Sequence, residues 1–208
     1  MSRYSFLDLA TSASVKAAQA EMGVDHLWTP GQVDRQMEAF TENEEAFIAA
    51  RDSFYMASVS ETGWPYVQYR GGPPGFLKVL DETTLAFADF RGNRQYISVG
   101  NLDANDRVAL ILVDYPRRAR LKILAHVERL ALDAEPGLLE RVSDETYRAR
   151  PERIFKLRLA AFDWNCPQHI VPRFTEAEIS RAVQPLHQKI EALEAENRAL
   201  RERITAEG

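Results

Sequence analysis

The stretch DFRGNRQYISVGNL, from Asp89 to Leu102, forms a basic and amide-rich corner where an apolar strand gives way to a predicted helix. Asn93, Arg94 and Gln95 stand in consecutive positions there. An arginine near the start of a helix adds a fixed guanidinium to the unpaired backbone N–H groups of the first turn, and together they suit a phosphate. Asn93 and Gln95 supply neutral donors beside it. The corner is therefore a candidate phosphate site, although an arginine after a strand is more often simply solvated.

The loop RGGPPG, from Arg70 to Gly75, is a second candidate binding element. Its glycines would let the backbone approach a flat ligand closely, because glycine has no Cβ. Arg70 stands at the end of a predicted strand and offers another positive charge. Gly and Pro also gather in turns that bind nothing, so a plain turn is the competing interpretation.

The segment FDWNCPQH, from Phe162 to His169, places a tryptophan, two amides and a histidine at the end of a predicted strand. Trp164 is able to pack against an aromatic ligand, and His169 is able to contact a polar ring edge or a substrate. The alternatives are a core tryptophan and a surface histidine. We interpret Cys166 as a small inert hydrophobe rather than a nucleophile.

The sequence lacks the motifs of covalent and metal catalysis. It has no Gly-x-Ser-x-Gly elbow, no His-Glu-x-x-His pair and no P-loop lysine motif. One cysteine and four scattered histidines provide neither a disulfide nor metal-ligand spacing. An enzyme with this inventory takes its chemistry from a cofactor and itself supplies binding, orientation and electrostatics. We assign no catalytic residue and no metal site.

The composition limits the class of protein. A chain of 208 residues suits one domain with terminal additions better than two full domains. No apolar run approaches the roughly 20 residues of a membrane span, and the N-terminus lacks the apolar region of a signal peptide. The formal net charge of −5 argues against a general nucleic-acid binder. We expect a cytoplasmic protein without nucleic-acid or membrane partners.

Residues 51–174 carry the pattern of an antiparallel, mainly β domain, in which short β-rich runs alternate with turn residues. The first four predicted strands follow one another closely, which favours a meander. About six strands with inserted helices indicate a small closed barrel. The predicted strands cover residues 54–60, 65–70, 76–80, 84–89, 108–114, 120–130 and 153–163.

Helices are predicted on both sides of this domain. In the N-terminal segment 1–50, one helix over 15–22 ends at Gly23, and Thr41 with Glu44 has the spacing of a capping box that begins another. We expect this segment to pack on the barrel. Further helices are predicted over 94–102 and after Pro136.

The C-terminal segment 175–208 predicts an amphipathic helix that Pro185 interrupts or restarts. Its apolar residues alternate at spacings of four and three, which indicates a short heptad seam with one asparagine at an a position. Two interpretations stay open: a parallel pair of helices supported by the barrel, or a single helix docked on its own barrel. The seam comprises Leu186, Ile190, Leu193, Asn197, Leu200 and Ile204.

Three regions together resemble the pyridoxamine 5′-phosphate oxidase-like family, whose members are FMN proteins of split-barrel fold. The likeness covers roughly Phe54 to Phe174. The block LDETTLAFADFRGNRQYISVGNLDAND resembles the one in which a Ser-Arg-Lys element holds the FMN phosphate, with Asn93-Arg94-Gln95 in its place. RLKILAHVERL, residues 120–130, resembles the next long strand. IFKLRLAAFDWNCPQH, residues 154–169, resembles the last strand, whose tryptophan lies beside the flavin.

The sequence also departs from that family's pattern. Gln95 stands where the family has a phosphate-binding lysine, and Leu121 stands where a strand-initial Arg-Gln pair has its glutamine. Pyridoxamine phosphate oxidases contact their substrate through an arginine and a histidine shortly after the tryptophan, where this chain has Ile-Val-Pro at 170–172. These departures disfavour vitamin B6 as the substrate.

The resemblance implies an antiparallel FMN-binding split barrel that forms a homodimer with the flavin at the interface. It also implies an FMN-dependent oxidoreductase that acts on an unidentified small molecule. The alternative is a non-catalytic flavin- or haem-binding protein whose coiled-coil tail recruits a partner. The implied cofactor-binding residues are Arg70, Gly71, Asp89, Asn93, Arg94, Gln95, Ser98, Trp164 and Gln168, and Lys78 and His169 are candidate substrate contacts.

Overall fold

The computed structural model describes residues 6–28, 39–165 and 167–207, so Cys166 lies outside the described residues. The chain forms two compact units. One contains the described residues up to 168, apart from the turn at 115–118. The other contains that turn and the described residues from 169 onward. The domain boundaries predicted at residues 51 and 174 stay a prediction.

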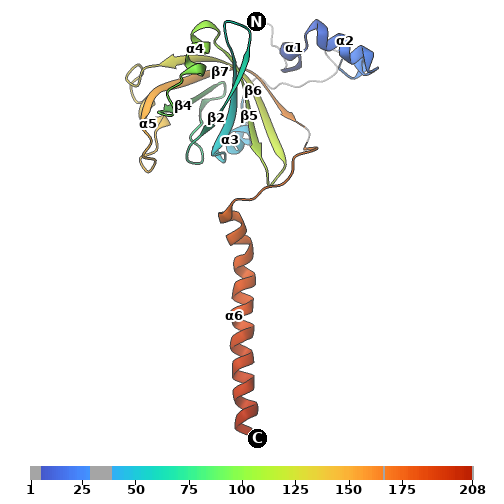
Figure 1. Ribbon diagram of the computed structural model, residues 1–208, viewed down its shortest axis with the longest axis vertical. Helices are drawn as coiled ribbons and strands as arrows, with labels where there is room; N and C mark the ends of the chain where they lie inside the picture. Colours follow the sequence, from blue (N-terminus) through green and yellow to red (C-terminus); the bar gives the residue numbers. More distant parts are fainter. Residues whose placement is uncertain (1–5, 29–38, 166, 208) are drawn as a thin grey trace. The chain divides into compact units, whose positions relative to one another are not determined.

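Seven antiparallel strands form one sheet in the first unit (Figure 1), in the order β2-β1-β5-β6-β7-β4-β3. The prediction of a mainly β, antiparallel fold is confirmed, and every predicted strand lies within two residues of an observed one at each end. The strands are β1 (Ser53–Val59), β2 (Pro65–Gly71), β3 (Lys78–Asp81), β4 (Thr84–Phe90), β5 (Arg107–Asp114), β6 (Ala119–Leu130) and β7 (Pro151–Asn165).

The predicted four-strand meander is wrong. β1 pairs with β2 and β3 pairs with β4, but β2 and β3 stand at opposite ends of the strand order. The RGGPPG loop makes no hairpin, because the N–H groups of Gly72 and Gly75 donate to the carbonyls of Asp52 and Arg51. The loop is therefore tied to the start of β1 and carries the chain across the barrel.

The predicted closed barrel also needs correction. Among the described residues, no backbone ladder joins β2 to β3, so the sheet has two ends. The side chains of Arg70 on β2 and Asp89 on β4 form an ion pair that joins these distant strands. The barrel is split, and side chains bridge the split.

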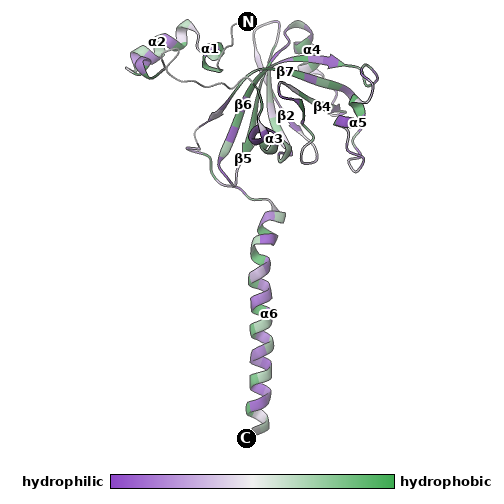
Figure 2. Ribbon diagram, turned by 180° about the vertical axis from the view of Figure 1, so that it is seen from behind, coloured by the Kyte–Doolittle hydropathy of each residue, from purple (hydrophilic) through white to green (hydrophobic). Residues whose placement is uncertain are grey.

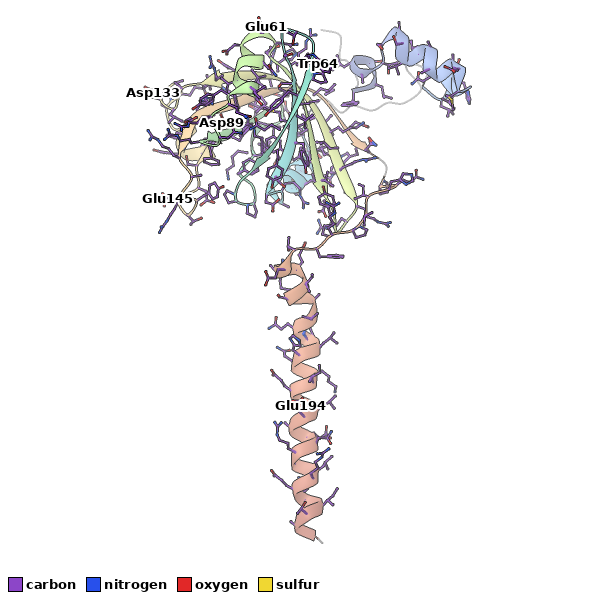
Figure 3. The ribbon with its side chains drawn as sticks, viewed as in Figure 1. Glu61, Trp64, Asp89, Asp133, Glu145 and Glu194 are labelled. Carbon is purple, nitrogen blue, oxygen red and sulfur yellow. The ribbon has the colours of Figure 1, made fainter. Side chains whose placement is uncertain are left out.

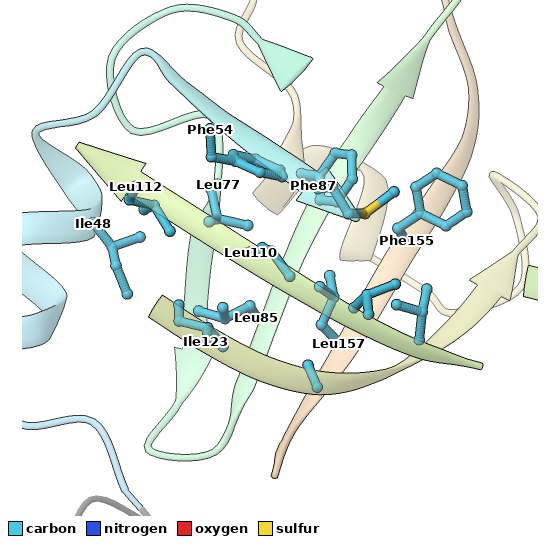
Figure 4. Packing of buried hydrophobic residues seen from close by; sticks show 14 of the residues in the cluster. Ile48, Phe54, Leu77, Leu85, Phe87, Leu110, Leu112, Ile123, Phe155 and Leu157 are labelled. Atoms are coloured by element: carbon cyan, nitrogen blue, oxygen red, sulfur yellow. The ribbon is translucent and has the colours of Figure 1, made fainter. Parts of the chain in front are cut away.

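The core follows from the alternation of side chains along the strands. On β5, Val108, Leu110 and Leu112 are buried. Leu121 on β6 is fully buried among them, so this position serves the core. Phe54, Phe87 and Phe155 belong to the same cluster (Figure 4). Each such side chain stabilises the fold by about 1.5–3 kcal/mol relative to an exposed one.

The N-terminal helices differ in how much they bury. The helix α3 (Glu42–Ala49) begins with the predicted capping box between Thr41 and Glu44, and its Ile48 is fully buried. The helix α2 (Ala13–Glu21) is followed by Gly23 at a φ of 68°, as predicted, but buries none of its residues. Packing on the core is thus observed for α3. The described part of this region also contains the short helices α1 (Phe6–Ala10) and η1 (Asp25–Trp28).

The helix after the amide-rich corner begins later than predicted. α4 spans Ile97–Ala104, because Arg94 and Tyr96 take left-handed φ angles of 62° and 52° that a right-handed helix does not allow. A second short helix, α5 (Leu138–Val142), follows β6 and Gly137. α4 and α3 lie at opposite ends of the strands (Figure 1).

The second unit consists mainly of the helix α6 (Glu176–Glu207). Its predicted capping pair is confirmed, because Glu178 N–H donates to Thr175 Oγ1 and Thr175 N–H donates to Glu178 Oε2. The predicted break at Pro185 is wrong, since the helix continues through it. Proline removes one intrahelical hydrogen bond, and the surrounding helix-favouring residues sustain the rest. Among the described residues, no helix has the length and apolar content that crossing a membrane requires.

Candidate functional site

Asp89 is the centre of a buried ion cluster drawn from three strands. Its Oδ1 pairs with Nη1 of Arg70 on β2, and its Oδ2 accepts a hydrogen bond of 2.7 Å from Nη1 of Arg153 on β7. The pairing register places Asp89 directly opposite Arg153. All three side chains are less than a fifth exposed. Figure 3 labels Asp89 in the first unit. Its carboxylate fixes both guanidinium groups.

Further contacts hold Arg153 from the solvent side. Its Nη2 lies 3.2 Å from Oε2 of Glu152, and its guanidinium carbon lies 4.9 Å from the centroid of the Tyr96 ring. The Tyr96 hydroxyl donates to Glu152 Oε1 at 3.2 Å. The left-handed backbone at Tyr96 directs the chain into α4 immediately afterwards. Arg153 is consequently restrained from two sides before any ligand arrives.

Arg70 is the most desolvated cation of the cluster. Burial lowers the pKa of its guanidinium, and the negative charge of Asp89 raises that pKa in partial compensation. Its Nε is buried and has no hydrogen-bond partner among the described residues. Buried polar groups are normally paired. This N–H group is therefore available to donate a hydrogen bond to an acceptor atom of a ligand.

Two adjoining cavities open at this cluster and share five lining residues, among them Arg70, Asp89 and Gly92. We call the larger of the two the wide cavity and the smaller the corner cavity. The wide cavity has a volume of about 450 Å³, which is within the range of small-molecule sites. The corner cavity lies beside the start of α4. The corner cavity is lined by Gln68, Arg70, Asp89, Phe90, Gly92, Asn93, Arg94, Tyr96, Ser98, Val99, Glu152 and Arg153.

Two residues of the amide-rich corner, Asn93 and Arg94, line the corner cavity. Arg94 is exposed there and makes no ion pair or hydrogen bond among the described residues. Asn93 Oδ1 accepts from the Gln95 N–H at 3.1 Å, which shapes the turn and leaves the Asn93 amide nitrogen available. Ser98 is buried and donates to Gln68 Oε1 at 2.8 Å. Gln95 itself does not line either cavity.

Trp164 is not brought to this cluster within one chain. Its Nε1 donates to Glu44 Oε1 at 2.7 Å, and its ring lies edge-on to Phe47 at 4.7 Å. These contacts join β7 to α3, which is the structural role that the sequence left open. Gln168 and His169 are exposed in the turn after β7 and line neither cavity.

Lys78 also lines neither cavity. It stands on β3, at the end of the sheet, and its charge acts on Asp144. Hydrogen bonds from Thr146 lower the pKa of Asp144, and the charge of Lys78 lowers it further. The structure therefore gives Lys78 an acidic neighbour outside the candidate site.

The glycines of RGGPPG are required by packing. A Cβ on Gly72 would lie 2.7 Å from Cγ of Phe76, and one on Gly75 would lie 2.9 Å from the carbonyl oxygen of Ala49. Gly75 also has a φ of 75°. The turn interpretation accounts for these two residues, although Gly71 and Gly72 do line the wide cavity.

Seven residues that line the corner cavity were not predicted as site residues, and four of them have polar side chains: Gln68, Tyr96, Glu152 and Arg153. Arg153 is 64 positions from Asp89 and reaches it only through the pairing of β4 with β7. Gln68 belongs to a predicted strand, and its alternation with Arg70 was the one available signal that both face the same side.

The profile of the pyridoxamine 5′-phosphate oxidase family matches residues 40–163, which is more than half of the chain. The chain belongs to this family. The matched region contains Asp89, Arg94 and Arg153, so the ion cluster is part of the family domain. Gln168 and His169 lie beyond it.

Solved structures add matches of low similarity. An FMN-binding protein from Syntrophomonas wolfei is 16% identical, with a TM-score of 0.47 over 74% of this chain and 95% of its own. HupZ from Group A Streptococcus is 14% identical, with a TM-score of 0.46 over 65% and 99%. An FAD-binding protein from Mesorhizobium loti is 15% identical, with a TM-score of 0.41 over 61% and 94%. No curated protein matches the chain. The family assignment rests on the profile.

Proposed function

We propose that this pyridoxamine 5′-phosphate oxidase family member binds FMN, with the flavin phosphate in the corner cavity. One observation carries the proposal: the unpaired Arg94 lines the same cavity as the fixed cations Arg70 and Arg153. Asp89 and Glu152, which line the same cavity, neutralise only part of the charge of the three arginines. A phosphate accepts several charge-assisted hydrogen bonds at once, so it matches this donor set better than a neutral group does.

The wide cavity supports the placement of the flavin ring. Its lining combines Phe76, Phe87 and Tyr147 with the polar side chain of Gln68 and the backbone of Gly71. Aromatic walls with a few polar groups are typical of sites for flat cofactors. In this proposal the chain holds the phosphate at one end and shields the ring at the other.

We further propose a homodimer with the flavin at its interface. The outer face of β1 and β2 supports it, because Tyr55, Val67 and Tyr69 are 41%, 60% and 58% exposed there. Contiguous exposed apolar side chains mark protein interfaces. Trp164 and Gln168 stay predicted flavin contacts, to be tested in the dimer.

In this proposal the protein is an oxidoreductase. A bound flavin supplies hydride or electron-pair transfer at its N5. The residues of this chain bind and orient the cofactor, and Asp89 acts as a positioning residue through Arg70 and Arg153. The substrate is an unidentified small molecule, and vitamin B6 is disfavoured by the residues at 170–172. A cytoplasmic location stays a prediction.

The experiment that tests phosphate binding compares FMN with riboflavin, which lacks the phosphate, in a fluorescence titration. The wild-type protein is expected to bind FMN more tightly than riboflavin. Arg94→Ala is expected to weaken FMN binding by roughly tenfold to hundredfold and to leave riboflavin binding unchanged.

The matched control is Arg158→Ala, which removes an exposed arginine on β7 that lines neither cavity. It is expected to bind both flavins as the wild type does. Equal FMN affinity in Arg94→Ala and Arg158→Ala would contradict a phosphate site in the corner cavity.

A non-catalytic flavin or haem carrier is the second candidate. It is favoured by one observation: both carboxylates of the corner cavity, Asp89 and Glu152, already hold arginines, so neither is free to move a proton. Steady turnover of the bound cofactor with a reductant and an acceptor decides between the two. Sustained turnover supports the oxidoreductase, whereas a bound chromophore that never turns over supports the carrier.

A further inference from the structure

The helix α6 carries a longer apolar seam than the sequence indicates. Because α6 continues through Pro185, the alternating spacing of four and three extends upstream to Ile179. Pro185 itself falls at a c position, away from the seam. The α6 seam has Val183, Ile190, Asn197 and Ile204 at its a positions and Ile179, Leu186, Leu193 and Leu200 at its d positions.

The seam is uncovered along the helix. Leu186 and Ile204 are 62% and 72% exposed, and of the seam residues only Val183 is half-buried. Figure 2 shows apolar and hydrophilic residues following one another along α6. A lone helix of this composition is marginally stable in water, because most helical stability comes from packing an apolar face.

We propose that the α6 seam pairs with the seam of a second copy of this chain in a parallel, two-stranded coiled coil. The residue types select this arrangement. Its apolar a positions are all β-branched and three of its four d positions are leucine, which favours two parallel strands over three or four.

The charges beside the seam match between two parallel copies. In a parallel pair each g residue faces the e residue of the following heptad on the other helix. Lys189 then faces Glu194 of the other copy, and Glu196 faces Arg201. Both pairs have opposite charges, and two-fold symmetry makes each of them twice.

Asn197 sets the direction of the helices. In a parallel pair in register, Asn197 faces its twin across the axis, and the two amides hydrogen-bond to each other. In an antiparallel pair, a positions face d positions, so Asn197 would lie against a leucine or isoleucine with its amide unsatisfied. An unpaired buried amide costs about 1–3 kcal/mol, and each chain would carry one.

The proposed coiled coil depends on the residues of α6 alone and does not depend on the flavin site. In this proposal the partner of α6 is a second copy of this chain and not a different protein. A parallel pair brings both Glu176 ends together and therefore keeps the two chains associated at the same end. Such linkage raises the effective concentration of the two first units and favours any contact between them.

Disulfide trapping in the full chain tests the pairing. In a Cys166→Ser background, Leu200→Cys introduces a thiol at a d position, and the matched variant Ala195→Cys introduces one at the outward f position. Two d thiols in register lie within disulfide reach across the seam, whereas two f thiols do not. Under mild oxidation, Leu200→Cys is expected to form the covalent dimer at least roughly tenfold faster than Ala195→Cys. Equal rates would overturn the proposal.

A second comparison keeps the native cysteine. The double variant Ile190→Asp with Leu193→Asp places charges in the seam, and Ala192→Asp with Ala195→Asp places the same charges outside it. Far-UV circular dichroism is expected to lose the α6 helical signal only in the seam variant, because its helices no longer pair. Equal helix content in the two variants would also overturn the proposal. Neither result depends on whether flavin binds.

Discussion

Asp89 lines both cavities, and its direct contact with a cofactor stays a prediction. It is buried, and both of its oxygens are engaged by arginines. A carboxylate repels a phosphate, so in the proposed function Asp89 positions the two guanidinium groups that bind the phosphate. Arg70 and Arg153 would repel each other without it. The cluster therefore links the stability of the fold to the geometry of the site.

Asp89→Asn removes the charge that balances these arginines. Breaking a buried ion pair on one side typically costs about 3–5 kcal/mol, and the same order is expected here in urea unfolding. The matched control is Asp103→Asn, because Asp103 pairs with Arg129 at 2.9 Å with both side chains about half exposed. That variant is expected to lose less than about 1 kcal/mol. Similar losses in the two variants would contradict a central role for Asp89.

The sequence pointed to the residues of the corner as a candidate site, but it did not predict their backbone conformation or the partners of their side chains. Arg94 was expected at a helix start, but it stands three residues before α4 in a left-handed conformation. Local patterns do not report such a φ for an arginine. Arg153 was missed because its contact with Asp89 depends on strand pairing across 64 positions.

At the scale of elements, Glu44 joins α3 to the last strand. Its carboxylate accepts from the Thr41 N–H at 3.0 Å and from Trp164 Nε1 at 2.7 Å. Burial raises the pKa of Glu44, but the hydrogen bonds from Thr41, Trp164 and Asn43 outweigh burial and leave that pKa below its usual value of 4.5. The ionised form is thus favoured in the folded protein.

A lowered pKa in the folded state gives Glu44 a defined pH dependence. Its contribution to stability is present above the unfolded pKa of 4.5 and is lost as the pH falls through the lower folded value. Glu44→Gln is expected to reduce the free energy of unfolding by roughly 1–2 kcal/mol at a pH of about 7 and by less at a pH of about 3.

Urea unfolding at the two pH values measures this difference, with Glu45→Gln as the control. Glu45 is the exposed neighbour on the same helix, and its substitution is expected to change stability little at either pH. A loss in Glu44→Gln that does not shrink at low pH would show that ionised Glu44 is not responsible.

The strands were predictable because alternation and turn residues mark them locally. Their order was not. The RGGPPG loop has the composition of a hairpin turn, but its N–H groups bond to residues 51 and 52 and its chain crosses the barrel. The continuity of α6 through Pro185 could not be predicted either, because a proline normally ends a helix. No local pattern indicates that the helical hydrogen bonds on both sides of the proline persist.

At the scale of the whole molecule, the candidate site lies where the split barrel is bridged. β2 is one end of the sheet and β4 stands next to the other, and the Arg70–Asp89 pair joins them. A ligand that occupies the corner cavity contacts both sides of this split. Binding is consequently expected to stabilise the folded protein by RT ln(1 + L/Kd), where L is the free ligand concentration, and this rises with the logarithm of L once L exceeds Kd.

The family of the chain was recognisable from its motifs, and the profile match confirms it. The assignment of Trp164, Gln168 and His169 to the site was not reproduced within one chain. A sequence motif records residue types, but it does not record whether a side chain serves its own subunit or a second one. The proposed homodimer is the assembly in which those three residues are to be tested.

The most direct measurement is an absorption spectrum of the purified protein, with the released chromophore identified by mass, beside the same spectrum of Arg94→Ala. The proposed phosphate site predicts FMN in the wild-type protein and much less in the variant. A colourless wild-type protein that also fails to take up added FMN would contradict the central claim.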